Sequence, residues 1–212
     1  MKIAVVGWPY IIGGLVFGAI GLAFVRRGMG AGWALAAPGL LFAAFCGYFF
    51  RDPERPLPAD PARIYSPGDG RVLSVGREAG EGDTIRIFLS IFDVHVQRLP
   101  VAGRIEKVEY VPGTFAMAMD KEAKENERNI VTISAEGRGS LVVVEQIAGL
   151  IARRIRCWVT AGASGRAGER YGLIQFGSQA AVHLPAGTRS LVKPGDRVVG
   201  GITPVAEWTA TR

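Results

Sequence analysis

The sequence predicts a mostly β protein, with a compact antiparallel β sandwich or barrel-like domain that follows an N-terminal apolar helical hairpin. Three features of the 212 residues support this: two long uncharged runs within the first fifty positions, a proline-rich segment after them, and many short β-branched runs in the remainder. Short runs punctuated by Gly, Pro and Asp are typical of antiparallel strands. We therefore expect a hairpin and linker over residues 1–56 and a β-rich domain over residues 57–212.

The hairpin prediction rests on residues 9–25 and 33–50, neither of which contains a charged side chain. As helices these runs would be about 25 to 27 Å long, slightly less than a hydrocarbon core of about 30 Å. Trp and Tyr residues near their ends favour a membrane interface. A membrane-associated hairpin, spanning a thin bilayer or re-entrant, is therefore predicted. A cleaved signal peptide fits poorly because Arg26 and Arg27 lead into a second apolar run, and the buried hairpin of a soluble protein remains an alternative.

The linker is the segment 51–70, which holds five prolines and no helical periodicity. Proline removes a backbone donor and disfavours helix interiors, so this segment is expected to be extended. We place the domain boundary near Pro56.

The β domain is predicted from seven runs of β-branched and apolar residues, at 71–75, 84–92, 103–111, 129–136, 141–148, 151–159 and 171–176. One helix is expected over residues 120–128, which contain good helix formers and few β-branched side chains. A Lys-Pro-Gly-Asp turn at 193–196 echoes Ser-Pro-Gly-Asp at 66–69. The echo suggests two pseudo-symmetric halves.

Composition narrows the chemistry. Cys46 and Cys157 are the only cysteines, so neither a disulfide framework nor a CxxC metal site is expected, and a reducing compartment is the simpler interpretation. With only His95 and His183, a multi-histidine metal centre is not expected either. The net charge of +6 fits an anionic membrane or a nucleic acid. The apolar N-terminus favours the membrane, and the absence of a recognisable module of interleaved basic and aromatic residues argues against nucleic acid.

The pair Gly177-Ser178 follows the apolar run at 171–174 closely. A hydrolase nucleophile lacks support, because the surroundings read Phe-Gly-Ser-Gln-Ala instead of Gly-x-Ser-x-Gly. A turn serine would be unremarkable. The residues around Ser178 do not decide between these interpretations.

Six segments, taken together, carry a family resemblance: 66–70 (SPGDG), 88–103 (FLSIFDVHVQRLPVAG), 111–115 (VPGTF), 120–128 (DKEAKENER), 144–155 (VEQIAGLIARRI) and 168–178 (GERYGLIQFGS). In this order and spacing they resemble the phosphatidylserine decarboxylase family, in its short prokaryotic form with a membrane hairpin. The resemblance covers essentially the whole soluble domain. It implies a pyruvoyl-dependent enzyme that converts phosphatidylserine to phosphatidylethanolamine.

The resemblance also implies a cofactor that the chain makes from itself. Ser178 attacks the carbonyl of Gly177, the chain is cleaved between these residues into α and β chains, and residue 178 becomes a pyruvoyl group. The pyruvoyl carbonyl then forms a Schiff base with the substrate amine and accepts electrons as carbon dioxide leaves. No metal and no added cofactor are implied.

Site residues follow by the same resemblance. His95 matches the histidine that acts in decarboxylation, and Asp69 matches its acidic partner. Long family members carry a second histidine, associated with serine activation, where this chain has Arg98, which cannot act as a base but can hold a phosphate or carboxylate. Either His95 therefore serves both steps or a group such as Asp69 assists the serine. Phe115 and Met117 are expected beside the substrate.

Location and partners complete the expectations. The catalytic domain is expected at the cytoplasmic face of the cell (inner) membrane, with a phospholipid substrate and no nucleic acid partner. The sequence leaves open whether the chain forms a homodimer. His183 is expected to be structural, since its odd offset from Ser178 faces the other side of a strand. The alternative function is a non-enzymatic carrier of lipoyl or biotinyl type, or a membrane adaptor.

Overall fold

The computed structural model describes residues 2–78, 81–115, 125–150 and 154–209. Its contacts divide the chain into two units, Met1–Glu54 and Arg55–Arg212. We call these the hairpin unit and the β unit. The division lies close to the boundary predicted at Pro56.

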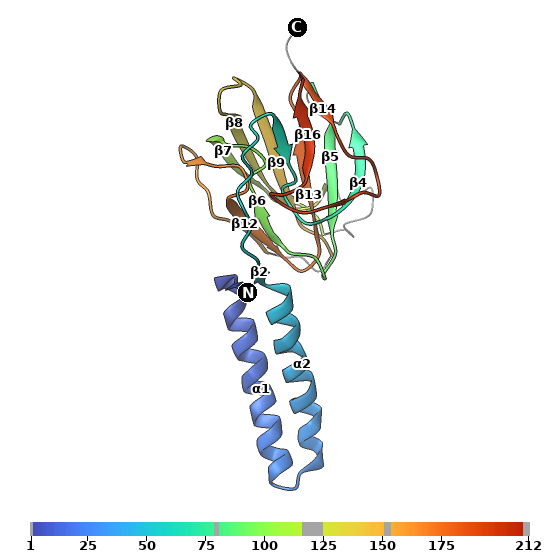
Figure 1. Ribbon diagram of the computed structural model, residues 1–212. Helices are drawn as coiled ribbons and strands as arrows, with labels where there is room; N and C mark the ends of the chain where they lie inside the picture. Colours follow the sequence, from blue (N-terminus) through green and yellow to red (C-terminus); the bar gives the residue numbers. More distant parts are fainter. Residues whose placement is uncertain (1, 79–80, 116–124, 151–153, 210–212) are drawn as a thin grey trace. The chain divides into compact units, whose positions relative to one another are not determined.

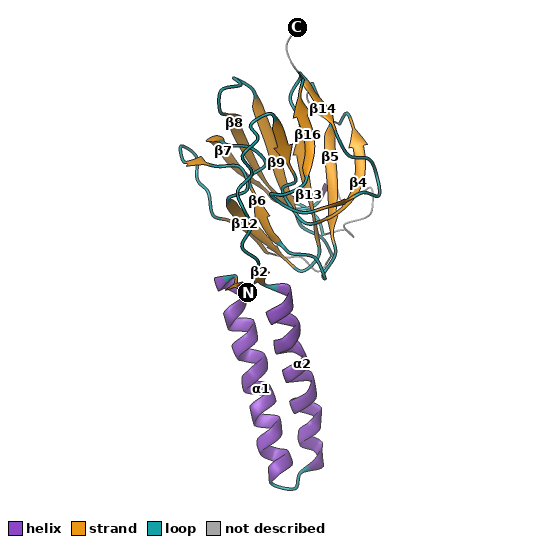
Figure 2. Cartoon of the chain, viewed as in Figure 1, coloured by secondary structure: helices purple, strands orange, loops and turns teal. Residues whose placement is uncertain are grey.

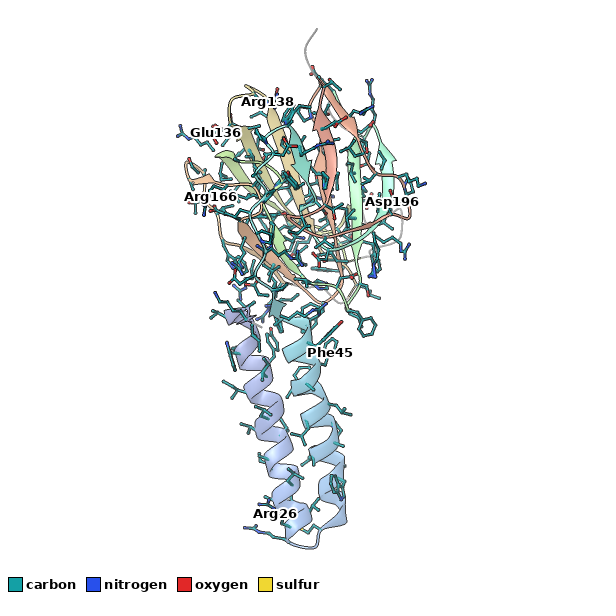
Figure 3. All side chains as sticks on the ribbon, in the orientation of Figure 1. Arg26, Phe45, Glu136, Arg138, Arg166 and Asp196 are labelled. Atoms are coloured by element: carbon teal, nitrogen blue, oxygen red, sulfur yellow. The ribbon has the colours of Figure 1, made fainter. Side chains whose placement is uncertain are left out.

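The hairpin unit consists of two antiparallel helices, α1 (Trp8–Arg26) and α2 (Trp33–Phe49). Short 3-10 turns precede each helix, η1 at Val5–Gly7 and η2 at Gly30–Gly32. A two-stranded ribbon of β1 (Lys2–Ile3) and β2 (Arg51–Asp52) closes the open end of the hairpin. Arg26 lies at the far tip and Phe45 nearer the ribbon (Figure 3).

Small residues let the two helices approach closely. A Cβ added to Gly14 would lie 2.8 Å from the carbonyl oxygen of Gly39, so the backbones touch there. Large apolar side chains such as Ile12, Phe17 and Leu41 are instead exposed on the outer sides. Two segments, Val5–Arg26 and Gly30–Phe49, are long and apolar enough to cross a membrane. This finding is weak evidence for the predicted membrane hairpin.

The β unit is built on an open sheet of eight strands (Figure 2). In spatial order these are β11 (Ser164–Gly165), β7 (Gly103–Val111), β8 (Arg128–Ala135), β9 (Leu141–Ile147), β13 (Ser178–His183), β5 (Thr84–Leu89), β4 (Gly70–Gly76) and β15 (Arg197–Val198). All neighbours in the sheet pair antiparallel.

Two three-stranded sheets complete the unit. One contains β10 (Arg154–Cys157), β12 (Arg170–Gln175) and β6 (Val96–Arg98), and the other β14 (Thr188–Ser190), β16 (Pro204–Trp208) and β3 (Arg63–Tyr65). Side chains from all three sheets share one core, exemplified by Ile87 and Val144 of the large sheet with Tyr171 and Val205 of the small ones. This arrangement confirms the predicted mostly β fold as a sandwich, without a closed barrel.

Each of the seven predicted strand runs contains a strand, although residues 151–153 of one run lie outside the described residues. The central strand β13 was not predicted, and neither were the short strands β3, β6, β11, β14, β15 and β16. The predicted helix at 120–128 falls mainly outside the described residues. It is wrong at its end, where Asn126 bridges to Thr114 and Arg128 opens β8.

Antiparallel pairing brings one set of strand ends together. Val111, Ile147 and Leu89 end β7, β9 and β5 at the same end of the sheet where Ser178 begins β13. We call this the Ser178 end. The loops that surround it come from segments far apart in the sequence.

Candidate active site at Gly177-Ser178

Ser178 occupies a buried position in the middle of the large sheet. It opens β13 as the Cα partner of Leu89, and its side chain points to the core face, which it shares with Ala180 and Val182. The residue is fully buried, and within the described chain its Oγ has no hydrogen-bond partner. Buried hydroxyls are nearly always bonded, so an unpartnered one calls for an explanation, and the Tyr171 hydroxyl is a second such group in the described chain.

The backbone before Ser178 is strained. Phe176 has φ 69° and Gly177 has φ 74°, both in the left-handed region. Phe176 is the one residue other than glycine with positive φ in the described part of the chain, and this conformation costs about 1–2 kcal/mol for an L-residue. A Cβ on Gly177 would lie 3.7 Å from Ile91, an ordinary contact. Conformation, and not space, therefore requires glycine at 177.

His95 contacts the residue that supplies the predicted scissile carbonyl. Its ring is fully buried, with Nδ1 3.0 Å from the carbonyl oxygen of Asp93 and Nε2 3.3 Å from the backbone nitrogen of Gly177. A carbonyl oxygen only accepts hydrogen bonds, so Nδ1 carries the proton and donates. Nε2 then accepts from the Gly177 N–H. A neutral imidazole thus directs its lone pair toward Gly177, as a general base requires.

The loop that carries His95 is held in place by Asp93. The Asp93 carboxylate accepts a hydrogen bond from the Ser90 N–H at 2.9 Å and forms an ion pair with Arg197 at 3.0 Å. Sequence reasoning did not identify Asp93. The signal for it was its place two residues before His95, because Asp commonly fixes its own turn.

Asp69 lies in a different set of contacts. Its two carboxylate oxygens accept hydrogen bonds from Arg55 at 2.7 and 2.8 Å, and one of them also accepts from the Gly200 N–H at 2.8 Å. Arg55 donates in turn to the Gly200 carbonyl. These bonds make Asp69 a link between two loops, and its predicted partnership with His95 stays a prediction.

Arg98 is buried near the same loops. Its Nη1 donates to the Gly168 carbonyl at 3.0 Å. A Cβ added to Gly201 would lie only 2.8 Å from the Arg98 Cδ, so the side chain packs closely against that glycine. A Cβ on Gly68 would lie 3.3 Å from a methyl group of Leu89, the Cα partner of Ser178. Binding of a substrate phosphate or carboxylate by Arg98 stays a prediction.

The two predicted substrate contacts have different outcomes. Phe115 packs against the buried pair Ala148 and Ile174, at the Ser178 end of the sheet. Met117 lies outside the described residues. Among the residues that the structure describes, no three His, Cys, Asp or Glu side chains gather into a metal-binding group.

His183 lies on the opposite face of β13 and links three strands. Its Nδ1 is 2.8 Å from the Thr84 hydroxyl on β5, and its Nε2 is 3.1 Å from the Glu145 carboxylate on β9. Burial raises the pKa of Glu145, but the hydrogen bond and charge of His183, together with the charges of Arg86 and Arg128, hold that pKa below its usual value. The position favours the predicted structural role for His183.

We expect Glu145→Gln to lower the free energy of unfolding by about 2 kcal/mol near pH 7, because the buried carboxylate loses its contact with His183 and its attraction to Arg86 and Arg128. A depressed carboxyl pKa stabilises the fold above its ordinary value of 4.5, and this contribution disappears as pH falls through the depressed value. The difference between variant and wild type should therefore shrink below about pH 4.5. Denaturant unfolding in detergent at several pH values measures it.

Glu136→Gln is the matched control, because Glu136 lies exposed on the loop between β8 and β9. It should unfold like the wild type at every pH. If Glu145→Gln lowers the free energy of unfolding equally at about pH 3.5 and about pH 7, the ionised carboxylate does not contribute to stability as predicted.

Comparison with known proteins assigns the chain to a family. The family profile described as phosphatidylserine decarboxylase matches residues 42–206. A phosphatidylserine decarboxylase proenzyme of Symbiobacterium thermophilum is 46% identical over 207 residues, covering 94% of this chain and 92% of the relative. Proteins of the same description from Burkholderia vietnamiensis (44% identical, 95% of this chain, 94% of the relative) and Cupriavidus pinatubonensis (41%, 95% and 93%) are similar over 210 residues. The chain therefore belongs to the phosphatidylserine decarboxylase family.

Proposed function

We propose that this chain is a pyruvoyl-dependent decarboxylase that converts phosphatidylserine to phosphatidylethanolamine after cleaving itself between Gly177 and Ser178. The relatives' description as phosphatidylserine decarboxylase proenzymes supports the reaction. The observation that carries the self-cleavage is the buried, unpartnered Ser178 hydroxyl of the described chain, which directly follows two left-handed residues.

The self-cleavage balances with groups that the chain supplies. Ser178 Oγ bonds to the carbonyl carbon of Gly177, the peptide C–N bond breaks, and the hydroxyl proton ends on the freed amine. Loss of the Cα proton of residue 178 then breaks its Cβ–Oγ bond. The long chain leaves as a carboxylate at Gly177, and residue 178 becomes dehydroalanine. Its imine tautomer takes up water and releases ammonia, which leaves a ketone at the start of the short chain.

The surroundings of residue 178 suit a ketone. The position is fully buried between β5 and β9, and Leu89 is its partner on the neighbouring strand. A pyruvoyl carbonyl supplies an electrophile for the substrate amine and a sink for the electron pair that carbon dioxide leaves behind. His95 Nε2 lies on the Gly177 side of this position, where it is suited to hold or return a proton.

His95 is the best-placed group for two proton transfers, removal of the Ser178 hydroxyl proton in self-cleavage and protonation of the substrate after decarboxylation. Asp69 is engaged by Arg55, and Arg98 stays protonated, so neither suits a base beside Ser178. Nε2 already directs its lone pair toward Gly177. To activate Ser178 it must exchange its bond to the Gly177 N–H for the serine hydroxyl. Catalytic hydrogen bonds often tighten in this way only when the reaction begins.

Membrane anchoring belongs to the same proposal. The substrate resides in a bilayer, and the two apolar helices of the hairpin unit have the length and composition to insert into one. We assign them the role of holding the β unit at the inner membrane, with the reaction on the cytoplasmic face.

The decisive experiment combines mass with product. Protein purified from membranes should show, under denaturing conditions, a long chain ending at Gly177 and a short chain of residues 178–212 with a blocked amino terminus. The same preparation should release labelled carbon dioxide from carboxyl-labelled phosphatidylserine, in equal amount to the phosphatidylethanolamine formed. A wholly uncleaved protein with full activity would overturn the pyruvoyl mechanism.

The strained Phe176 provides a separate prediction about the rate of self-cleavage. Phe176→Gly should slow cleavage about three- to tenfold, because glycine relaxes a conformation whose cost of roughly 1–2 kcal/mol helps to destabilise the precursor. The rate is measured by intact mass at successive times after cell-free synthesis.

Phe176→Ala separates strain from the lost ring, because alanine keeps a Cβ and therefore disfavours the left-handed region. Its cleavage should stay closer to the wild-type rate than that of Phe176→Gly. Equal slowing in both variants would assign the effect to packing of the ring instead of strain.

A further inference from the structure

Five exposed apolar side chains lie at the Ser178 end of the β unit. We call this set the apolar rim: Phe92 (63% exposed), Leu150 (54%), Val199 (40%), Ile202 (40%) and Val111 (37%). Val111 is the last residue of β7, and the other four lie in the connections after β5, β9 and β15. Exposed single apolar residues are ordinary, but a group gathered at one end of a domain indicates an interaction surface.

The opposite end of the sheet has a different character. Glu136 and Arg138 extend from the loop between β8 and β9 (Figure 3). Leu141, at the start of β9, is an exposed apolar residue at the opposite end, at 52%. It therefore offers a control site with similar exposure at the other end of the same sheet.

Phe92 is held outward by a loop that also belongs to the active site. The loop is fixed by the bonds of Asp93 to Ser90 and Arg197, and it carries His95 against Gly177. Ile91, next to Phe92, is the side chain nearest to a Cβ on Gly177. An exposed aromatic ring therefore lies three residues from the proposed proton donor, on a segment that is tied down.

The location of Ser178 decides which partner fits the rim. Residue 178 is fully buried, so a substrate reaches it through the loops at its own end of the sheet. A phospholipid enters from a bilayer, whose acyl layer accepts apolar side chains. Beside the rim, Arg71 and Arg197 are Cα partners on neighbouring strands and are both exposed; Arg197 is paired with Asp93, and Arg71 adds a positive charge that suits anionic headgroups.

We propose that the apolar rim of the β unit inserts into the surface of an anionic phospholipid bilayer, as a membrane contact additional to the helical hairpin. The inference rests on the proposed function, because a lipid substrate is what makes a bilayer the partner. Phe92 and Ile202 enter the boundary between headgroups and acyl chains, while His95 and residue 178 stay above it. The substrate headgroup then travels a short distance into the site and its acyl chains remain in the membrane.

Depth-dependent quenching tests the contact without relying on activity. The full chain, with Cys46→Ala and Cys157→Ala, receives one new cysteine by Phe92→Cys, Ile202→Cys or Leu141→Cys and is labelled with the fluorophore NBD. The labelled chain is then reconstituted into phosphatidylglycerol-containing vesicles with spin-labelled acyl chains. We expect at least about threefold stronger quenching at positions 92 and 202 than at 141, with blue-shifted emission. Equal quenching at all three positions would overturn the proposal.

Activity gives an independent measure. The measured quantity is the ratio of turnover on phosphatidylserine vesicles to turnover on short-chain phosphatidylserine. Phe92→Ser should lower this ratio about tenfold, because one large apolar side chain no longer enters the bilayer. Leu141→Ser should leave this ratio unchanged, and intact mass confirms that both variants cleave. An unchanged ratio in Phe92→Ser would count against the rim.

Two further outcomes are informative. One distinguishes a bilayer from a second copy of the chain as the partner of the rim, and the other separates the bilayer contact from the proposed reaction. If the probe at 92 is shielded in detergent alone and the protein has twice the chain mass, a second copy covers the rim and the proposal fails. If quenching is selective but the wild type does not decarboxylate phosphatidylserine, the bilayer contact stands and the proposed function fails.

Discussion

Ser178→Ala is expected to remain a single uncleaved chain without decarboxylase activity. Alanine has no oxygen to attack the carbonyl of Gly177, and no ketone can form at residue 178 without the Cβ–Oγ bond that elimination breaks. The variant should fold, because the serine hydroxyl has no hydrogen-bond partner in the described chain and its loss leaves no polar group unsatisfied. Intact mass under denaturing conditions and carbon dioxide release measure both effects.

Ser140→Ala is the control, since Ser140 lies half-buried near the opposite end of the sheet, in the connection before β9. It should cleave and decarboxylate like the wild type. Ser178→Cys adds a graded test, because a thiol can attack the same carbonyl and slow cleavage is expected. Complete cleavage of Ser178→Ala at position 177 would show that another group breaks the chain.

The strands that the sequence predicted share a visible signal. Runs such as 84–92 and 141–148 are rich in β-branched and apolar residues, and they form β5 and β9 because such side chains pack well on a pleated surface. The central strand β13 lacks that signal. Its Ser-Gln-Ala-Ala start has weak strand propensity, and it is a strand because β5 and β9 bind it on both sides.

The site was predicted unevenly for similar reasons. The resemblance pointed to His95 and Gly177 together, and the structure places them in hydrogen-bond contact. The left-handed conformation of Phe176 has no sequence signal, because an aromatic residue gives no indication of positive φ. The pairing of Asp69 with Arg55 also has no signal in the sequence. Arg55 lies in the linker, fourteen positions earlier in the chain, and only the folded loops bring the two side chains together.

His95→Ala should lower the turnover of phosphatidylserine by roughly two to four orders of magnitude, the usual effect of removing a positioned acid or base. If Nε2 is also the base for Ser178, self-cleavage should slow in the same variant. The two effects are separated by following intact mass over time, and by dividing carbon dioxide release by the amount of cleaved chain. Added imidazole should restore part of both rates, since it replaces the missing ring.

Two further variants decide what His95 contributes. His95→Gln keeps a polar group near Gly177 but cannot exchange protons near neutral pH, so it should be as slow as His95→Ala while folding better. His183→Gln changes the other histidine, on the far face of β13, and should still cleave. If His95→Ala cleaves at the wild-type rate but decarboxylates slowly, His95 acts only on the substrate and a different group activates Ser178. Full turnover in His95→Ala would remove the histidine from the mechanism, and the contact between Nε2 and the Gly177 N–H would then serve only to hold the strained turn before Ser178.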